Sequence, residues 1–206
     1  MTVAATPERS VEVLRLLRRT GGMLEGHFLL SSGLHSDRYF QCARLLQHPR
    51  HAGRVGRLLA ERCASLRPGL VVSPAIGGII VGHETGRALG VRAIFTEREQ
   101  GVMKLRRGFA IEPGERVLVV EDVVTTGKST LEAAAAVTAA GGRVVGLAAI
   151  VDRSGGVKFP HPFRALVRVK VAVWQPGACP LCREGGTPAV KPGSREMPHG
   201  APAATR

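Results

Sequence analysis

Apolar positions recur at helical spacing in two segments near the beginning of the chain. The first predicts a helix from Thr6 to Thr20, with Thr6 as its cap, Pro7 at its first position and the Gly21–Gly22 pair at its end. The second predicts a helix from about Pro49 to Leu66. The apolar stripes that would face a core are Val13, Leu14 and Leu17 in the first helix, and Val55, Leu58, Leu59, Cys63 and Leu66 in the second.

Short apolar runs alternate with helical stretches through the middle of the chain. Helices are predicted up to Leu89 and from Gly127 to the Gly141–Gly142 pair. Strands that alternate with helices predict βαβ units, so we expect an α/β fold with a mostly parallel sheet flanked by helices. One more strand, at an edge, is expected within residues 163–173. The apolar runs that predict buried strands are Leu70–Ser73, Val91–Phe95, Val117–Val120 and Arg143–Val151.

Two segments depart from this alternation. Residues 97–115 are polar, basic and too long for an ordinary connection, which predicts a mobile functional loop. Proline and glycine are frequent from Gln175 onward, and a disordered tail is expected over residues 191–206.

The length and composition of the chain favour one soluble globular domain. The 206 residues suit one domain, and 44% hydrophobic residues can form a core. The chain has no apolar run of about 18 residues that would predict a transmembrane helix, and its start lacks the pattern of a secretory signal. We therefore expect a soluble, cytoplasmic protein with reduced cysteines.

Positive charge narrows the possible partners without choosing one. The formal net charge is +13, and the isoelectric point is about 11.1. Such an excess fits a nucleic-acid binder, a binder of acidic membranes or an enzyme whose substrates are polyanions. The low aromatic content, 4%, counts against base stacking but not against phosphate binding. Composition assigns no role to the arginines of the first two helices, Arg15, Arg18, Arg19, Arg54, Arg57 and Arg62.

The segment with the most specific chemistry covers residues 117–130, which read VLVVEDVVTTGKST. Glu121 and Asp122 follow a predicted strand at its carboxyl end, where open parallel sheets bind ligands. A loop of hydroxyl residues and glycine then enters a helix, whose free N–H groups and dipole favour an anion. We predict a monophosphate cradle beside two carboxylates that could bind a ribose diol and stabilise positive charge on the sugar. The plainer alternative is that the two acids cap the helix or pair with arginine.

The string Gly127-Lys128-Ser129 does not indicate a nucleoside-triphosphate loop. Such a loop needs a glycine five positions before Gly127, and Asp122 stands there. A phosphate-binding segment of a different kind is therefore expected.

Residues 117–130 resemble the phosphoribosyl-diphosphate (PRPP) binding signature of the type I phosphoribosyltransferases. The rest of the chain resembles the orotate phosphoribosyltransferases in particular, over roughly Val13 to Arg195. The further motifs that carry this likeness are Gly26-His27-Phe28, then Ser32-Gly33, Ser36 and Tyr39-Phe40-Gln41, and Val151-Asp152-Arg153-Ser154-Gly155-Gly156.

The resemblance implies an enzyme that joins orotate to PRPP, giving orotidine 5′-monophosphate and diphosphate in pyrimidine synthesis. It implies a type I phosphoribosyltransferase domain over residues 1–190, with a small hood at about 20–45, a mobile lid at about 97–110, Mg²⁺ held mainly through PRPP, and a homodimer. The PRPP-binding residues would be Glu121, Asp122, Val123, Val124, Thr125, Thr126, Gly127, Lys128, Ser129 and Arg98. The orotate-binding residues would be Thr125, Arg153, Tyr39 and Phe40, and no metal ligand of the protein itself is expected.

The resemblance also implies that catalysis rests on Glu121, Asp122 and a lid lysine, Lys104. The lid departs from the family's usual pattern, because its histidine is absent and its lysine spacing differs. Arg106 and Arg107 are therefore alternatives to Lys104, and the sequence does not decide which lid cation is essential. Two further departures are Ser31, where many members have lysine, and Ile76-Gly77, where an aromatic-lysine pair is common.

Two other functions stay open. A phosphoribosyltransferase for another base would share the PRPP signature. A PRPP-sensing regulator that binds nucleic acid would explain the charge, but no helix-turn-helix or RNA-binding signature is found. We favour small-molecule partners, with no membrane and no nucleic acid.

Cys179 and Cys182 have the spacing of metal ligands. A second cysteine pair of this kind is missing, which favours a turn with two reduced thiols over a structural zinc site. Whether the two cysteines bind metal is not decided by the sequence. His27, His35 and His83 are weighed as neighbours of the active site, and His27 has the best case because it lies in a matched motif.

Overall fold

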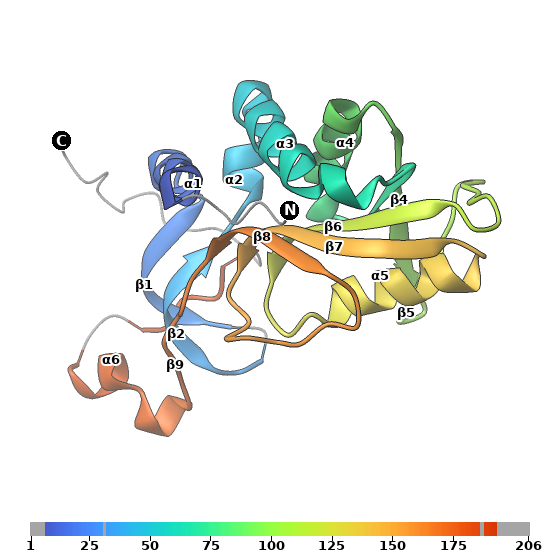
Figure 1. Ribbon diagram of the computed structural model, residues 1–206. Helices are drawn as coiled ribbons and strands as arrows, with labels where there is room; N and C mark the ends of the chain where they lie inside the picture. Colours follow the sequence, from blue (N-terminus) through green and yellow to red (C-terminus); the bar gives the residue numbers. More distant parts are fainter. Residues whose placement is uncertain (1–6, 31, 186–187, 193–206) are drawn as a thin grey trace. The chain divides into compact units, whose positions relative to one another are not determined.

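The computed structural model describes residues 7–30, 32–185 and 188–192 (Figure 1). Thr6, the predicted helix cap, and residues 193–206 of the predicted tail lie outside the described residues. Within the stretch predicted as one domain, 1–190, the chain forms two compact units. We call residues 1–23 and 40–170 the large unit, and residues 24–39 and 171–206 the small unit.

A six-stranded sheet forms the centre of the large unit. The strand order is β5-β4-β3-β6-β7-β8, and every neighbouring pair is parallel except β4 and β5. The predicted mostly parallel sheet is confirmed, and β8 supplies the predicted edge strand. The strands are β3 (Leu70–Pro74), β4 (Arg92–Glu99), β5 (Val102–Leu105), β6 (Arg116–Val124), β7 (Arg143–Asp152) and β8 (Phe163–Arg168).

Helices cover both faces of this sheet, with α3 and α4 on one face and α5 on the other (Figure 1). Strand side chains point alternately to opposite faces, so a sheet covered on both sides must be apolar at nearly every position. Leu70 and Val72 accordingly join Val137 of α5 in one core cluster, while Val71 between them is also fully buried. The helices are α1 (Pro7–Arg19), α2 (Ala43–Leu46), α3 (Pro49–Cys63), α4 (Gly78–Leu89) and α5 (Lys128–Ala139).

The first helix ends where the sequence predicts. Gly21 adopts a positive φ of 66°, and the Gly22 N–H donates to the Leu17 carbonyl at 2.7 Å, a hydrogen bond typical of a helix end at glycine. The second predicted helix is shorter than expected, because α3 ends at Cys63 and a 3₁₀ turn (Ala64–Leu66) follows it.

Ion pairs between α1 and α3 involve part of the positive charge that composition left without a role. Arg54 donates to both carboxylate oxygens of Glu12, at 2.7 and 2.8 Å, and Arg9 pairs with Glu61 at 2.9 Å. These pairs are partly or largely exposed, so each contributes little to stability. They do explain why Arg54 is needed on a face that turns toward α1.

The small unit contains a three-stranded sheet in the order β1-β2-β9. Its strands are β1 (Met23–Leu29), β2 (His35–Phe40) and β9 (Val173–Trp174). The first residue of β1, Met23, and the last residue of β2, Phe40, belong to the large unit. Val173, predicted to end the edge strand, therefore belongs to a different sheet from β8. A 3₁₀ turn (Pro176–Ala178) and the short helix α6 (Pro180–Arg183) follow β9. The predicted hood, at about 20–45, includes β1 and β2. No helix among the described residues is long and apolar enough to cross a membrane.

Two glycines of α3 give a matched test of the packing between α3 and α4. A methyl group at Gly56 would lie 2.6 Å from the backbone carbonyl carbon of Glu84, whereas one at Gly53 would meet only the mobile ends of the Arg87 and Glu84 side chains. We expect Gly56→Ala to lower the free energy of unfolding by about 1–3 kcal/mol, because backbone atoms cannot move aside. Gly53→Ala should be neutral or stabilising, by at most about 1 kcal/mol of helix propensity. Urea unfolding of both variants measures this, and equal effects would contradict the packing described.

Candidate active site

Strand β6 is longer than the sequence predicts, and the additional residues include the two carboxylates. The strand was expected to end at Val120, but it continues to Val124, so Glu121 and Asp122 lie within it and not after it. Pairing with β7 holds the whole extension, since Glu121 lies opposite Ala149 and Val124 opposite Asp152. The backbone of both acids is therefore fixed by the sheet.

Burial sets the electrostatics of this pair. Glu121 is only 7% exposed. Burial, and secondarily the neighbouring charge of Asp122, raises the pKa of Glu121 to about 9, and burial also raises the pKa of Asp122. Two backbone N–H groups donate to them, from Asp122 to Glu121 Oε1 at 3.3 Å and from Val123 to Asp122 Oδ1 at 2.8 Å. Because burial disfavours their ionised forms, both acids favour a ligand that brings hydroxyl groups and positive charge.

The loop after β6 leads directly into the amino end of α5. Gly127 precedes the helix with a positive φ of 76°, and a methyl group there would lie 2.8 Å from the Phe159 ring, so a larger residue would displace the loop. The Lys128 N–H donates to Thr126 Oγ1 at 3.4 Å. The remaining cradle residues, Thr125, Thr126, Lys128 and Ser129, are exposed. The predicted cradle thus presents hydroxyl groups, a lysine and a helix amino end to solvent, as anion binding requires.

Arg153 lies beside this loop because of strand pairing. The Arg153 N–H donates to the Val124 carbonyl at 2.9 Å, which places Arg153 next to Thr125 across the end of the sheet. Asp152 fixes the turn that follows: its Oδ1 accepts from the Ser154 N–H at 3.0 Å and from Ser154 Oγ at 2.6 Å. Two residues predicted for orotate binding are therefore brought together.

The loop after β3 closes over the same carboxylates. A methyl group at Gly77 would lie 2.7 Å from Asp122 Oδ2, so glycine is the one residue that lets this loop approach the carboxylate without a clash. Ile76, which stands where the family commonly has an aromatic residue, is 86% exposed. The loop after β3 and the carboxyl end of β6 thus meet at Asp122, as expected at the carboxyl edge of a parallel sheet.

The predicted lid is a hairpin along much of its length. β4 continues to Glu99 and pairs antiparallel with β5, from Thr96 opposite Leu105 to Glu99 opposite Val102, around a turn at Gln100 and Gly101. The prediction of a loop over residues 97–115 is therefore wrong for residues 97–105, which form paired strands apart from the turn at Gln100 and Gly101. Gly101 and Gly108, the expected hinges, both have positive φ, of 83° and 71°.

Pairing in this hairpin places Arg98 and Lys104 on opposite faces. Arg98 lies opposite Met103, a side chain of the core cluster beneath α5, and Lys104 lies opposite Glu97. Residues directly opposite in a ladder share a face, and neighbours along a strand do not. Arg98 accordingly pairs with Glu132 of α5, while Lys104 Nζ pairs with Glu99 at 2.9 Å. The structure does not bring these two predicted site residues together.

The alternative lid cations are also paired with acids. Arg106 lies 3.2 Å from Glu99, and Arg107 donates to Glu97 at 2.6 and 2.9 Å. All four lid cations are exposed. Exposed ion pairs of this kind are weak, so an incoming diphosphate can replace the carboxylates.

The two aromatic residues predicted for orotate fall in different units. Phe40 belongs to the large unit and is 6% exposed, which leaves little of its ring for stacking. Tyr39 belongs to the small unit, with its ring centre 6.0 Å from that of Phe28. Their contact with a pyrimidine stays a prediction.

Three further residues of the site were missed by sequence reasoning. Glu132 pairs with Arg98 and lies 3.9 Å from Lys128, so it links the hairpin to the cradle helix. Of these two contacts, only the Lys128–Glu132 pair could be predicted from the sequence, because the two residues are four positions apart on one helix. Phe159 packs on Gly127 from a distant loop. The Cys42 thiol, whose pKa is raised by burial and then by the charges of Asp122 and Glu121, lies 4.0 Å from the Asp122 carbonyl. No local pattern signals the last two contacts.

Comparisons with known proteins agree with this geometry. The phosphoribosyl transferase domain family matches residues 41–179. The orotate phosphoribosyltransferase of Heliobacterium modesticaldum is 57% identical over 190 residues, covering 89% of this chain and 97% of that protein. That of Acidithiobacillus ferrooxidans is 54% identical over 198 residues, covering 90% and 97%. Among solved structures, Mycobacterium tuberculosis orotate phosphoribosyltransferase with inorganic phosphate has a TM-score of 0.65 and 32% identity, covering 79% of this chain and 96% of that one. The same enzyme with 5-phospho-α-D-ribosyl 1-diphosphate gives 0.62 and 29%, covering 80% and 91%.

Burial of Glu121 predicts how stability depends on pH. Its pKa rises from 4.5 to about 9 on folding, so between these values the folded protein holds a proton that the unfolded chain has released. A rise in pH therefore favours unfolding, and we expect the free energy of unfolding to fall by up to about 1 kcal/mol per pH unit between about pH 6 and pH 8.5. Urea unfolding at several pH values measures this slope.

Two variants assign the slope to this carboxyl group. Glu121→Gln should reduce it, and Asp122, whose pKa is also raised by burial, should leave a smaller slope of the same sign. Glu132→Gln is the control, because the Arg98 hydrogen bond lowers the pKa of Glu132 and confines its effect to acid pH. Identical slopes for Glu121→Gln and the parent chain would contradict the assignment.

Proposed function

Since the chain belongs to the orotate phosphoribosyltransferase family, we propose that its site transfers the phosphoribosyl group of PRPP to orotate, giving orotidine 5′-monophosphate and diphosphate in pyrimidine synthesis. The observation that carries this is the adjacent Glu121 and Asp122, buried and half-buried in β6, followed directly by a hydroxyl-rich loop at the amino end of α5. Sugar-binding acids and a monophosphate cradle lie one loop apart, as a ribose 5-phosphate requires.

The cradle residues bind the 5-phosphate. Backbone N–H groups at the start of α5, the hydroxyl groups of Thr125, Thr126 and Ser129, and the exposed Lys128 supply donors and positive charge. Glu132, 3.9 Å from Lys128, holds that lysine near the loop. These contacts fix the sugar while its reacting carbon is left open.

Glu121 and Asp122 act on the ribose. They accept hydrogen bonds from its two ring hydroxyls, and positive charge near the diphosphate shifts them toward the ionised form. In the reaction, an orotate nitrogen forms a bond to the anomeric carbon as the bond to diphosphate breaks. Positive charge that develops on the sugar ring is then stabilised by two fixed negative charges in a site of low dielectric.

Arg153 recognises the acceptor base. Its planar guanidinium can bind the orotate carboxylate through two hydrogen bonds, a geometry that lysine cannot provide. The position next to Thr125, set by the hydrogen bond to Val124, brings base and sugar sites together. A base without a carboxylate lacks this contact, which favours orotate over other bases.

Mg²⁺ fits this site as a companion of PRPP. Mg²⁺ prefers oxygen ligands and would take them mainly from the diphosphate of PRPP, while Glu121 and Asp122 hold the ribose hydroxyls beside it. When bound, Mg²⁺ neutralises the diphosphate and improves it as a leaving group. The lid cations of residues 98–107 add to that neutralisation.

The positions of the lid cations bear on whether the protein acts as a homodimer. Because Arg98 and Lys104 lie on opposite faces of the hairpin, one diphosphate cannot receive both from a single lid in this conformation. A homodimer in which a lid cation reaches the neighbouring subunit's site would use both faces. Sedimentation analysis tests the dimer. A cytoplasmic location stays a prediction.

A spectrophotometric assay with orotate, PRPP and Mg²⁺ tests the proposed reaction. We expect loss of orotate absorbance, with no turnover of adenine, hypoxanthine or uracil. Transfer to one of those bases in place of orotate would favour a phosphoribosyltransferase of other specificity. Salt-dependent binding to random RNA or DNA, tighter than about micromolar near physiological salt and without turnover, would instead favour the PRPP-sensing regulator.

Asp122→Asn tests the carboxylate pair. The change removes one negative charge and keeps the shape of the side chain, so turnover should fall about 100-fold or more while the fold is retained. Steady-state kinetics and circular dichroism measure the two properties. Unchanged turnover would remove the pair from the mechanism.

Arg153→Ala tests recognition of the base. Loss of a charge-assisted contact worth about 1.5–3 kcal/mol should raise the KM for orotate about 10- to 100-fold and leave the KM for PRPP nearly constant. Arg153→Lys should restore less than half of the loss on the logarithmic scale, because one ammonium cannot form a paired contact. Equal changes in both KM values would contradict this placement.

A further inference from the structure

The small unit brings together four side chains that ligate transition metals. His27 comes from β1, His35 begins β2, and Cys179 and Cys182 flank the start of α6. Their ligand atoms, His27 Nε2, His35 Nδ1 and the two sulfurs, all lie within 4.8 Å of one another. All four residues belong to one compact unit, so this cluster does not depend on how the two units are placed.

The distances match those of a tetrahedral ion. Zinc with bonds of about 2.3 Å to sulfur and 2.0 Å to nitrogen holds neighbouring sulfur and nitrogen ligands about 3.5 Å apart. The sulfur–nitrogen distances here are 3.5 Å for Cys179–His27, 3.6 Å for Cys182–His27 and 3.3 Å for Cys182–His35. The two ring nitrogens are 2.8 Å apart and need only a small separation to admit an ion.

The missing second pair of ligands is therefore a pair of histidines. The sequence indicated a turn with two reduced thiols, because no second cysteine pair follows Cys179 and Cys182. His27 and His35 lie about 150 residues earlier and eight residues apart, at a spacing that signals no metal site by itself. The β1–β2 pairing and the return of the chain through β9 bring the two pairs together.

The chemistry of this donor set points to zinc in a structural role. Two sulfurs and two imidazoles suit zinc and are poor ligands for Mg²⁺ or Ca²⁺. Four protein ligands fill a tetrahedron and leave no position for substrate. His27, His35 and Cys179 are buried, while Cys182 is exposed.

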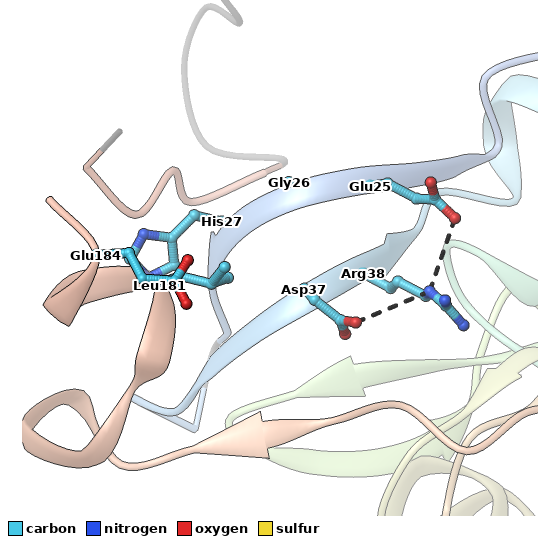
Figure 2. Close-up of a pocket in the computed structure, with 7 residues that line it drawn as sticks. All are labelled: Glu25, Gly26, His27, Asp37, Arg38, Leu181 and Glu184. Atoms are coloured by element: carbon cyan, nitrogen blue, oxygen red, sulfur yellow. Dashed lines mark ion pairs between the residues drawn. The ribbon is translucent and has the colours of Figure 1, made fainter. Parts of the chain in front are cut away.

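A cavity borders the cluster at His27. It has a volume of about 360 Å³ and is lined by strand residues on one side and by Leu181 and Glu184 on the other (Figure 2). Its charged strand residues are engaged with one another, since Arg38 lies 3.7 Å from Glu25 and 4.0 Å from Asp37.

The small unit has few apolar contacts to hold its last segment, which is also attached by β2–β9 pairing and by backbone hydrogen bonds of Val190 with His27 and Leu29. Among its described residues, the buried apolar side chains are Phe28 and Cys179. A core of this size cannot stabilise a three-stranded sheet and a four-residue helix, and small folds of this kind commonly rely on a metal. A metal that joins β1, β2 and α6 would supply the missing constraint.

We propose that His27, His35, Cys179 and Cys182 bind one Zn²⁺, which fastens the segment at residues 176–183 to the β1–β2 hairpin. The site is separate from the Mg²⁺ that accompanies PRPP and does not depend on the proposed function. Its test therefore uses metal content and spectroscopy, and enzyme activity is not a readout.

Metal analysis of untagged protein tests the stoichiometry. We expect one zinc per chain in protein made in zinc-containing medium and dialysed without chelator. Replacement by Co²⁺ should give the visible bands of a tetrahedral ion and a near-ultraviolet band from thiolate to cobalt. Zinc below a tenth of an equivalent together with no cobalt spectrum would overturn the proposal, as would a disulfide between Cys179 and Cys182 in protein purified under reducing conditions.

Variants test the ligands. The double variant Cys179→Ser, Cys182→Ser and the single variant His35→Ala should lower bound zinc at least tenfold. His48→Ala with His51→Ala is a matched control, because those rings also lie close together, 5.5 Å apart, but have no cysteine partner among the described residues. Zinc retained by the cysteine variant, or lost equally from the control, would contradict the assignment. If the cysteine variant does not fold, the cobalt spectrum of the parent protein still decides.

Discussion

The burial of Glu121, beside the half-buried Asp122 at the end of the central strand, is the constraint around which the large unit is organised. Glu121 and Asp122 remain in place because β6 pairs with β3 on one side and continues along β7 on the other. Their desolvation is unfavourable for the free protein, as the raised pKa of Glu121 shows. A Gly at position 77 lets the β3 loop cover Asp122, and a Gly at 127 lets the next loop turn into α5. Sheet pairing therefore maintains an acidic site that a ribose and its phosphate can satisfy.

Positive charge is distributed around that site in a way that net charge alone does not reveal. The lid cations are each paired with an acid: Arg98 with Glu132, Lys104 and Arg106 with Glu99, and Arg107 with Glu97. Exchange of exposed carboxylates for diphosphate oxygens requires little reorganisation. Elsewhere, Arg54 and Arg9 join α1 to α3. Part of the excess thus joins helices, and Arg98 and Lys128 both lie beside Glu132 at the start of α5.

Long patterns in the sequence predicted the fold well, and contacts between distant residues explain the differences. Continuous apolar runs identified β3, β4, β6 and β7, because both faces of the sheet are covered. The end of β6 was misplaced because pairing with β7, a tertiary contact, extends a strand through two acids that local propensity would exclude. The lid hairpin was missed for the same reason: its polar residues alternate around Met103, whose burial depends on α5. The histidine ligands could not be found from spacing, since two strands bring them to the cysteines.

In the proposed reaction, Glu121 and Asp122 stabilise positive charge on the sugar during transfer. The most direct measurement is the secondary isotope effect of tritium at the anomeric carbon of PRPP, with orotate as acceptor. The same measurement is made on the Asp122→Asn variant, in which transfer should be slow enough to limit the overall rate. The isotope effect of the transfer step is then fully expressed. A clearly normal effect is expected, because the bond to that hydrogen loosens as the carbon becomes planar and cationic. An effect near unity, in the parent protein and in the variant, would show a tight displacement without developed charge and would contradict the account.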